Sequence, residues 1–164
     1  MIASVAHKRG AINFEDLESR AAYTPTRAYQ QSKLADLTLS FELDRRLRAR
    51  GSRILSVAAH PGVANTNLFQ VGDFGAAERS VRKAFGHAIG LLLNSDAEGA
   101  LPTLFAATAP SPEVEGGGYY GPQGFAEMRG GDAGPARVAR QARDVEAWGR
   151  LWQICEDLTG VSIS

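Results

Sequence analysis

The chain has 164 residues, of which 44% are hydrophobic and 22% are charged, values typical of one soluble globular domain with a sizeable core. Its 18 basic and 18 acidic residues balance, which argues against a nucleic-acid partner or an anionic membrane partner. The sequence contains no run of about 20 apolar residues that could span a bilayer and no secretory pattern at its start. Its single cysteine, Cys155, is interpreted as a packed core thiol, and the sequence predicts a cytoplasmic protein.

The first half of the chain reads as strand, helix and strand. Residues 1–5 form a short apolar run, interpreted as the end of a buried strand. Residues 25–49 are predicted to form a long helix, with Thr24 placed as its N-cap and Gly51 as its stop. Residues 53–59 are nearly all apolar, which predicts a strand covered on both faces. A long helix leading into such a strand is typical of a parallel crossover unit.

The second half adds three helices and one strand. Helices are predicted at residues 76–93, 97–107 and 137–158, with Asp96 as the cap of the second. A short strand is expected at residues 117–120. These elements predict an α/β fold with about three strands, few for an independent parallel sheet. The clustered arginines of the long helix are interpreted as a solvated helix end: Arg45, Arg46, Arg48 and Arg50.

Tyr29 and Lys33 are four residues apart, so both lie on one face of the long helix. An ammonium group near a phenol favours the ionised phenolate, and a nearby hydroxyl such as that of Ser4 can bind the same substrate oxygen. Such a trio could protonate a carbonyl oxygen while hydride arrives at carbon. On the pair alone, a tyrosine packed beside a surface lysine is the favoured interpretation, and a serine at a strand end is usually a cap.

The order of the motifs resembles the short-chain dehydrogenase/reductase family, and more narrowly its retinol-dehydrogenase and protochlorophyllide-reductase-like branch. The resemblance covers essentially the whole chain. The motifs that carry it are Ser4-Val5-Ala6-His7, Phe14-Glu15-Asp16-Leu17, Tyr29-Gln30-Gln31-Ser32-Lys33-Leu34-Ala35 and His60-Pro61-Gly62-Val63.

The resemblance implies a role for each matching residue. Tyr29 would be the general acid/base, Lys33 would assist it and hold the nicotinamide ribose, and Ser4 would orient the substrate carbonyl. The implied cofactor-binding residues are Tyr29, Lys33, Pro61, Gly62, Val63 and Thr66. His7 and His60 are expected to form turn-stabilising hydrogen bonds, and no metal site is predicted because the histidines lack paired ligand spacing.

The glycine-rich turn that binds the cofactor pyrophosphate in this family has no counterpart here. The predicted fold is therefore the C-terminal half of a doubly wound, Rossmann-type parallel sheet, with residues 1–164 as a single partial domain and the N-terminal glycine-rich half absent. The implied cofactor is NADP or NAD, with NADP slightly favoured by the resemblance, and half a site is expected to bind it poorly. The implied substrate is a small-molecule carbonyl or alcohol.

Two functions remain open at this point. The chain could be the catalytic half of an NAD(P)-dependent oxidoreductase. It could instead be a truncated, non-catalytic interaction module, which would form a homo-oligomer through helix 25–49.

Overall fold

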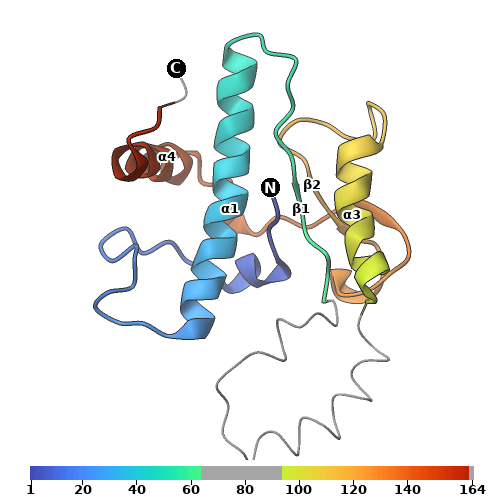
Figure 1. The fold of residues 1–164 in the computed structure, drawn as a ribbon, viewed down its shortest axis with the longest axis horizontal. Coiled ribbons are helices and arrows are strands. Elements are labelled where there is room, and N and C mark those ends of the chain that lie inside the picture. The colour runs from blue at the N-terminus through green and yellow to red at the C-terminus, as the bar shows by residue number, and fades with distance from the viewer. Residues whose placement is uncertain (64–93, 163–164) are drawn as a thin grey trace, which may run out of the picture.

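The computed structural model describes residues 1–63 and 94–162 (Figure 1). The predicted helix at 76–93 and the predicted cofactor contact Thr66 lie outside the described residues. Within the described ranges, no helix combines the length and the apolar character needed to cross a bilayer.

A small mixed sheet lies at the centre of the molecule. Its order is β1 (Ala58–Ala59), β2 (Tyr119–Pro122) and β3 (Ala133–Pro135), with β1 parallel to β2 and β2 antiparallel to β3. The start of the chain lies on the other side of β1, where Ile2 forms a parallel bridge with Ala59. The predicted α/β class is confirmed, whereas the antiparallel β3 was not predicted.

The predicted strands are shorter or shifted. The strand expected at residues 1–5 is a single bridge, because the chain turns at Val5 into η1 (Val5–Arg9), a 3-10 helix. Of the strand expected at residues 53–59, only Ala58–Ala59 is observed. Its partner β2 begins opposite Ala58, so residues 53–57 have no neighbouring strand residues to pair with. The strand expected at 117–120 is observed at residues 119–122.

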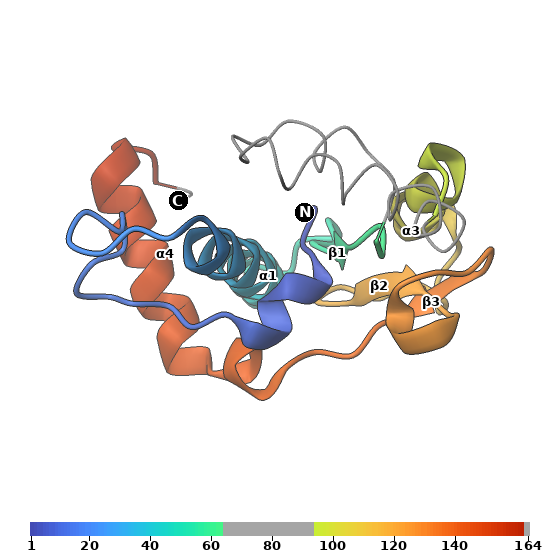
Figure 2. The same cartoon turned by 90° about the horizontal axis from the view of Figure 1, so that it is seen from below.

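Helix α1 (Pro25–Ala49) has the predicted bounds and packs between the sheet and the last helix. Leu34, Leu37 and Phe41 are buried in the core between α1 and the sheet. Figure 2 shows α1 with the sheet on one side and α4 (Val145–Thr159) on the other. Thr24 occupies the N-cap position, but its side chain makes no capping hydrogen bond.

The arginines near the end of α1 are largely exposed, as predicted, and three of them, Arg45, Arg46 and Arg48, also pair with buried carboxylates of the same helix. The carboxylate of Glu42 is 0% exposed and accepts hydrogen bonds from Arg45 at 2.7 and 2.8 Å and from Arg46 at 2.7 Å. Arg48 binds Asp44 at 2.5 Å. The cations are required because a buried carboxylate without partners would be strongly destabilising.

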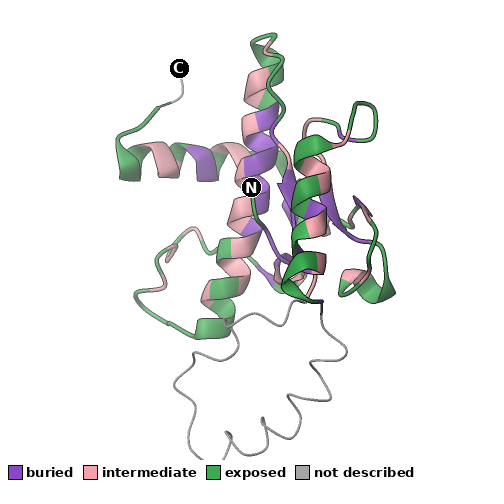
Figure 3. Cartoon of the chain, turned by 45° about the vertical axis from the view of Figure 1, so that its right-hand side comes forward, coloured by how far each residue is buried: buried purple, intermediate pink, exposed green. Residues whose placement is uncertain are grey.

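Helix α3 (Asp96–Thr108) covers the opposite face of the sheet, where Phe105 packs on Tyr120. Its N-cap is Ser95 rather than the predicted Asp96, because Ser95 and Glu98 form a reciprocal capping box. Buried positions accordingly gather on the strands and on the turns of α1 that face them (Figure 3).

The last helix begins later than the predicted residue 137. A 3-10 turn, η4 (Arg140–Arg143), comes first, and the side chain of Asp144 caps α4 by accepting from Glu146 N and Ala147 N. The helix ends at Thr159, and its C-cap, Gly160, has a φ of +68° that glycine adopts without strain.

Candidate active site

Ser4 lies at the end of the N-terminal segment, where that segment turns into η1. The bridge between Ile2 and Ala59 is parallel, so Ser4 and Pro61 each follow it by two residues, in the same direction. The carboxyl ends of neighbouring parallel strands are where α/β proteins place their ligands. The register therefore brings two of the predicted site segments to one edge of the sheet.

The backbone and side chain of Ser4 are both held in place. Its carbonyl oxygen accepts from His7 N at 3.1 Å and lies 2.7 Å from His7 Nδ1. Its hydroxyl oxygen accepts from Ala6 N at 3.2 Å, so Ser4 is also the N-cap of η1. A hydroxyl that accepts one bond still has its own hydrogen to donate. Capping is thus compatible with a bond from Ser4 to a substrate.

The ammonium group of Lys33 is bound to the N-terminal segment and to its own helix rather than extended into solvent. Its Nζ donates to the carbonyl oxygen of Ile2 at 3.1 Å and to Asp36 Oδ2 at 2.8 Å. These two bonds leave one of its three donor hydrogens available. Tyr29, one helical turn earlier, is 42% exposed and therefore open to a ligand.

Burial raises the pKa of Tyr119 on β2, and the negative charge of Glu127 raises it further.

The turn formed by Pro61, Gly62 and Val63 is enclosed by residues that lie far away in sequence. Gly62 has a φ of +73°, and a Cβ there would lie 2.4 Å from the carbonyl oxygen of Met128. That same oxygen accepts from Val63 N at 2.8 Å. Glycine is therefore required at position 62, both for the positive φ and because the carbonyl oxygen of Met128 leaves no room for a Cβ.

Asn94 is a structural partner of this turn that the sequence interpretation missed. It is 0% exposed, and its Nδ2 donates to the carbonyl oxygen of Pro61 at 2.9 Å. Its backbone N donates to the carbonyl oxygen of Val63 at 3.0 Å. Asn94 lies directly before the capping residue Ser95, so its only local sequence signal was that of a helix start.

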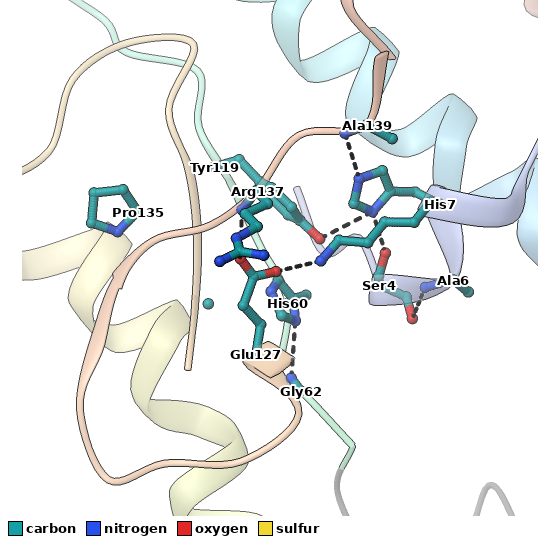
Figure 4. Close-up of polar contacts among 12 residues, drawn as sticks. Ser4, Ala6, His7, His60, Gly62, Tyr119, Glu127, Pro135, Arg137 and Ala139 are labelled. Atoms are coloured by element: carbon teal, nitrogen blue, oxygen red, sulfur yellow. Dashed lines mark hydrogen bonds and ion pairs between the residues drawn. The ribbon is translucent and has the colours of Figure 1, made fainter. Parts of the chain in front are cut away.

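The two described histidines form the expected turn-stabilising hydrogen bonds. His7 binds the carbonyl oxygen of Ser4, and His60 Nδ1 accepts from Gly62 N at 3.1 Å (Figure 4). Burial lowers the pKa of both, and that of His60 falls to about 4. Both rings are therefore neutral near pH 7. The side chain of His7, like that of His60, is 0% exposed.

A cavity of about 230 Å³ lies elsewhere, between α1, α4 and the loop that precedes α1. Its lining includes none of Ser4, Tyr29 and Lys33. The residues that line it are Leu17, Glu18, Ser19, Tyr23, Ala28, Gln31, Ser32, Ala35, Leu151 and Cys155. A second, more open hollow beside Arg140 and Arg143 is equally separate from the candidate site.

No protein-family model matches the chain. Mouse polyprenol dehydrogenase is 36% identical over 159 residues, which are 97% of this chain and 43% of that protein. Mouse retinol dehydrogenase 14 is 30% identical over 161 residues, or 98% of this chain and 44% of that protein. The crystal structure of an uncharacterised protein from Mycobacterium paratuberculosis matches with a TM-score of 0.75 and 34% identity, over 99% of this chain and 50% of that one. The chain thus spans less than half the length of these two curated relatives.

Proposed function

Because the chain belongs to the short-chain dehydrogenase/reductase family and corresponds to the C-terminal part of its dehydrogenase relatives, we propose that it carries the proton-transfer half of an NAD(P)-dependent oxidoreductase site. The observation that carries this proposal is the convergence at one sheet edge. Ser4 and Pro61 each follow the bridged pair Ile2 and Ala59 by two residues, and Lys33 binds the carbonyl oxygen of Ile2.

Tyr29 is the general acid/base of this site. In the direction of carbonyl reduction, its phenol donates a proton to the carbonyl oxygen, and Ser4 donates a hydrogen bond to the same oxygen. Lys33, four residues later on the same face of α1, stabilises the phenolate that remains. When bound, the nicotinamide supplies the hydride. The substrate is an apolar alcohol or its aldehyde, in line with the polyprenol and retinol named for the relatives.

The donor set fits the nicotinamide–ribose end of the cofactor. The ammonium of Lys33 has a donor left for a ribose hydroxyl, and the backbone of Pro61, Gly62 and Val63 offers a rigid edge for a flat ring. Thr66 is proposed as a further cofactor contact. Residues 1–164 would then act as one partial domain that binds mainly this end of NADP or NAD.

The alternative, an interaction module that uses α1 as a docking helix, has less support. Leu34, Leu37 and Phe41 of α1 are buried within the chain itself. What is left for a partner is mostly polar, together with the half-buried Leu39, Leu43 and Leu47.

Cofactor binding tests the proposal. We expect the chain to bind reduced nicotinamide mononucleotide and NADPH with similar affinity, because the contacts proposed here all involve the nicotinamide–ribose end. Titration followed by nicotinamide fluorescence measures both affinities, and Lys33→Ala should weaken both equally. The absence of saturable binding by either nucleotide would contradict the proposed function.

A further inference from the structure

Three buried rings link the segment that carries Ser4 to the turn that carries Gly62. His7 of η1 and Tyr119 of β2 meet edge to face, with ring centroids 5.2 Å apart at 89°. Tyr119 also meets His60, with centroids 5.1 Å apart. The two imidazoles are 0% exposed and Tyr119 is 3% exposed, so the contacts exclude solvent. We call His7, Tyr119 and His60 the ring column (Figure 4).

The hydrogen bonds at the two ends of the ring column fix opposite tautomers. Ala139 N donates to His7 Nε2 at 3.3 Å, so the ring proton of His7 is on Nδ1, which donates to the carbonyl oxygen of Ser4 at 2.7 Å. Gly62 N donates to His60 Nδ1, so the proton of His60 is on Nε2. One end of the column thus holds the backbone of Ser4, and the other holds the backbone of Gly62.

Tyr119 is the residue that joins the two ends. Its hydroxyl oxygen lies 3.4 Å from His7 Nδ1, the nitrogen that binds Ser4. Its ring packs on the imidazole that binds Gly62. No other residue among those described makes ring contacts with both histidines.

A second connection runs parallel to the column. Lys8 of η1 pairs with Glu127 at 2.5 Å, and the neighbouring carbonyl oxygen of Met128 accepts from Val63 N. Ala126 and Glu127 have φ values of 52° and 59°, a region that non-glycine residues avoid. Such strain persists only where the surroundings hold it, and it concentrates at functional sites.

We propose that His7 and Tyr119 are positioning residues, which hold Ser4 and the turn at Gly62 in fixed relative places through the ring column. This rests on the proposed function, because it treats these two segments as opposite walls of one site. Neither residue touches the substrate. Displacing a reacting group by about 1 Å can cost about 100-fold in rate, so fixed spacing matters to catalysis.

Two pairs of variants separate positioning from ordinary packing. Tyr119→Phe removes the hydroxyl of the column and keeps its ring. The matched control is Tyr120→Phe, because Tyr120 is equally buried at 3% and its hydroxyl accepts from Glu115 N on the other face of the sheet. His7→Asn keeps a donor near the position of Nδ1, whereas His7→Leu removes it.

Two backbone amides report the result without any turnover. Ala6 N donates to the hydroxyl of Ser4, and Gly62 N donates to His60, so their hydrogen-exchange rates follow the two ends of the column. We expect Tyr119→Phe to speed exchange at Ala6 by a few-fold relative to Tyr120→Phe, because it removes the second, longer acceptor of the His7 Nδ1 hydrogen. Exchange at Gly62 should stay unchanged in Tyr119→Phe, because the ring that packs on His60 is kept. His7→Leu should speed exchange at Ala6, and His7→Asn should restore it. Equal exchange at Ala6 in the Tyr119→Phe and Tyr120→Phe variants, or no rescue by His7→Asn, would overturn the proposal.

An activity readout distinguishes this proposal from the proposed function. With reduced nicotinamide mononucleotide and an apolar aldehyde, Tyr119→Phe should lower kcat and leave KM unchanged. If the amide of Ala6 responds but the unmodified chain neither binds nucleotide nor turns over, the proposed function fails and the column remains a structural link only. If the unmodified chain is active and Tyr119→Phe keeps its full kcat, the positioning role is wrong.

Discussion

His60 is a fully buried histidine whose Nε2 finds no partner among the described residues. Burial lowers its pKa from 6.5 to about 4, so the folded state keeps it neutral where the unfolded state takes up a proton. The unfolded chain then binds more protons between these two values. Stability must therefore fall as the pH is lowered through this window.

This predicts an acid sensitivity that a substitution should reduce. Between pH 7 and pH 5 we expect the free energy of unfolding to drop by about 2 kcal/mol from His60, since each pKa unit corresponds to about 1.4 kcal/mol. His60→Asn, whose side-chain oxygen can accept from Gly62 N, should flatten the dependence. Urea unfolding of the unmodified chain and of the variant at both pH values measures the drop in the free energy of unfolding. An equal drop in the variant would show that other groups, such as His7, are responsible.

Sequence reasoning located residues whose role is local and missed those whose role depends on the fold. Ser4 and Gly62 lie at the ends of apolar strand-like runs, and such ends are visible in the sequence. Asn94 binds Pro61, which lies 33 residues away, and no pattern around Asn94 encodes that contact. The roles of Tyr29, Lys33 and Thr66 stay predictions.

Among the elements, η1 and α1 approach so closely that only glycine fits between them. A Cβ at Gly10 would lie 2.5 Å from the carbonyl oxygen of Gln30 on α1. Gly10 directly follows η1, which carries His7, and α1 carries Lys33. The spacing of these two elements therefore sets the spacing of the candidate site.

We expect Gly10→Ala to destabilise the protein by about 1–3 kcal/mol, because the added methyl must displace backbone. The control is Gly149→Ala in α4, where a Cβ meets nothing within 4 Å. Gly149→Ala should stabilise the protein by about 0.5–1 kcal/mol, since alanine has a higher helix propensity than glycine. Thermal unfolding distinguishes the two. A Gly10→Ala variant as stable as the unmodified chain would mean that the contact is looser than described.

Helices were predicted well where their signals are local. The bounds of α1 follow from its apolar spacing and its flanking proline and glycine. The start of α4 was placed too early, because its true cap Asp144 comes after a 3-10 turn that has no distinct pattern. The partners of the α1 arginines were missed because burial of Glu42 is decided by packing of the whole chain.

For the whole molecule, the α/β class followed from a long helix between apolar runs. The sheet order and the antiparallel β3 did not, because β3 is only Ala133–Pro135 within a glycine-rich stretch. The chain covers 43% of mouse polyprenol dehydrogenase and 50% of the mycobacterial protein. The function proposed for this chain therefore concerns only the half of a site that its residues could supply.

The central claim is that Tyr29 transfers the proton in that half-site. The direct test is the rate of reduction of an apolar aldehyde, such as retinal, by reduced nicotinamide mononucleotide in the presence of the chain. We predict that Tyr29→Phe lowers this rate by about 100-fold or more, as expected for loss of a general acid. Tyr23→Phe, which changes another exposed phenol nearby in sequence, should leave the rate unchanged. Equal rates for Tyr29→Phe and the unmodified chain would contradict the claim.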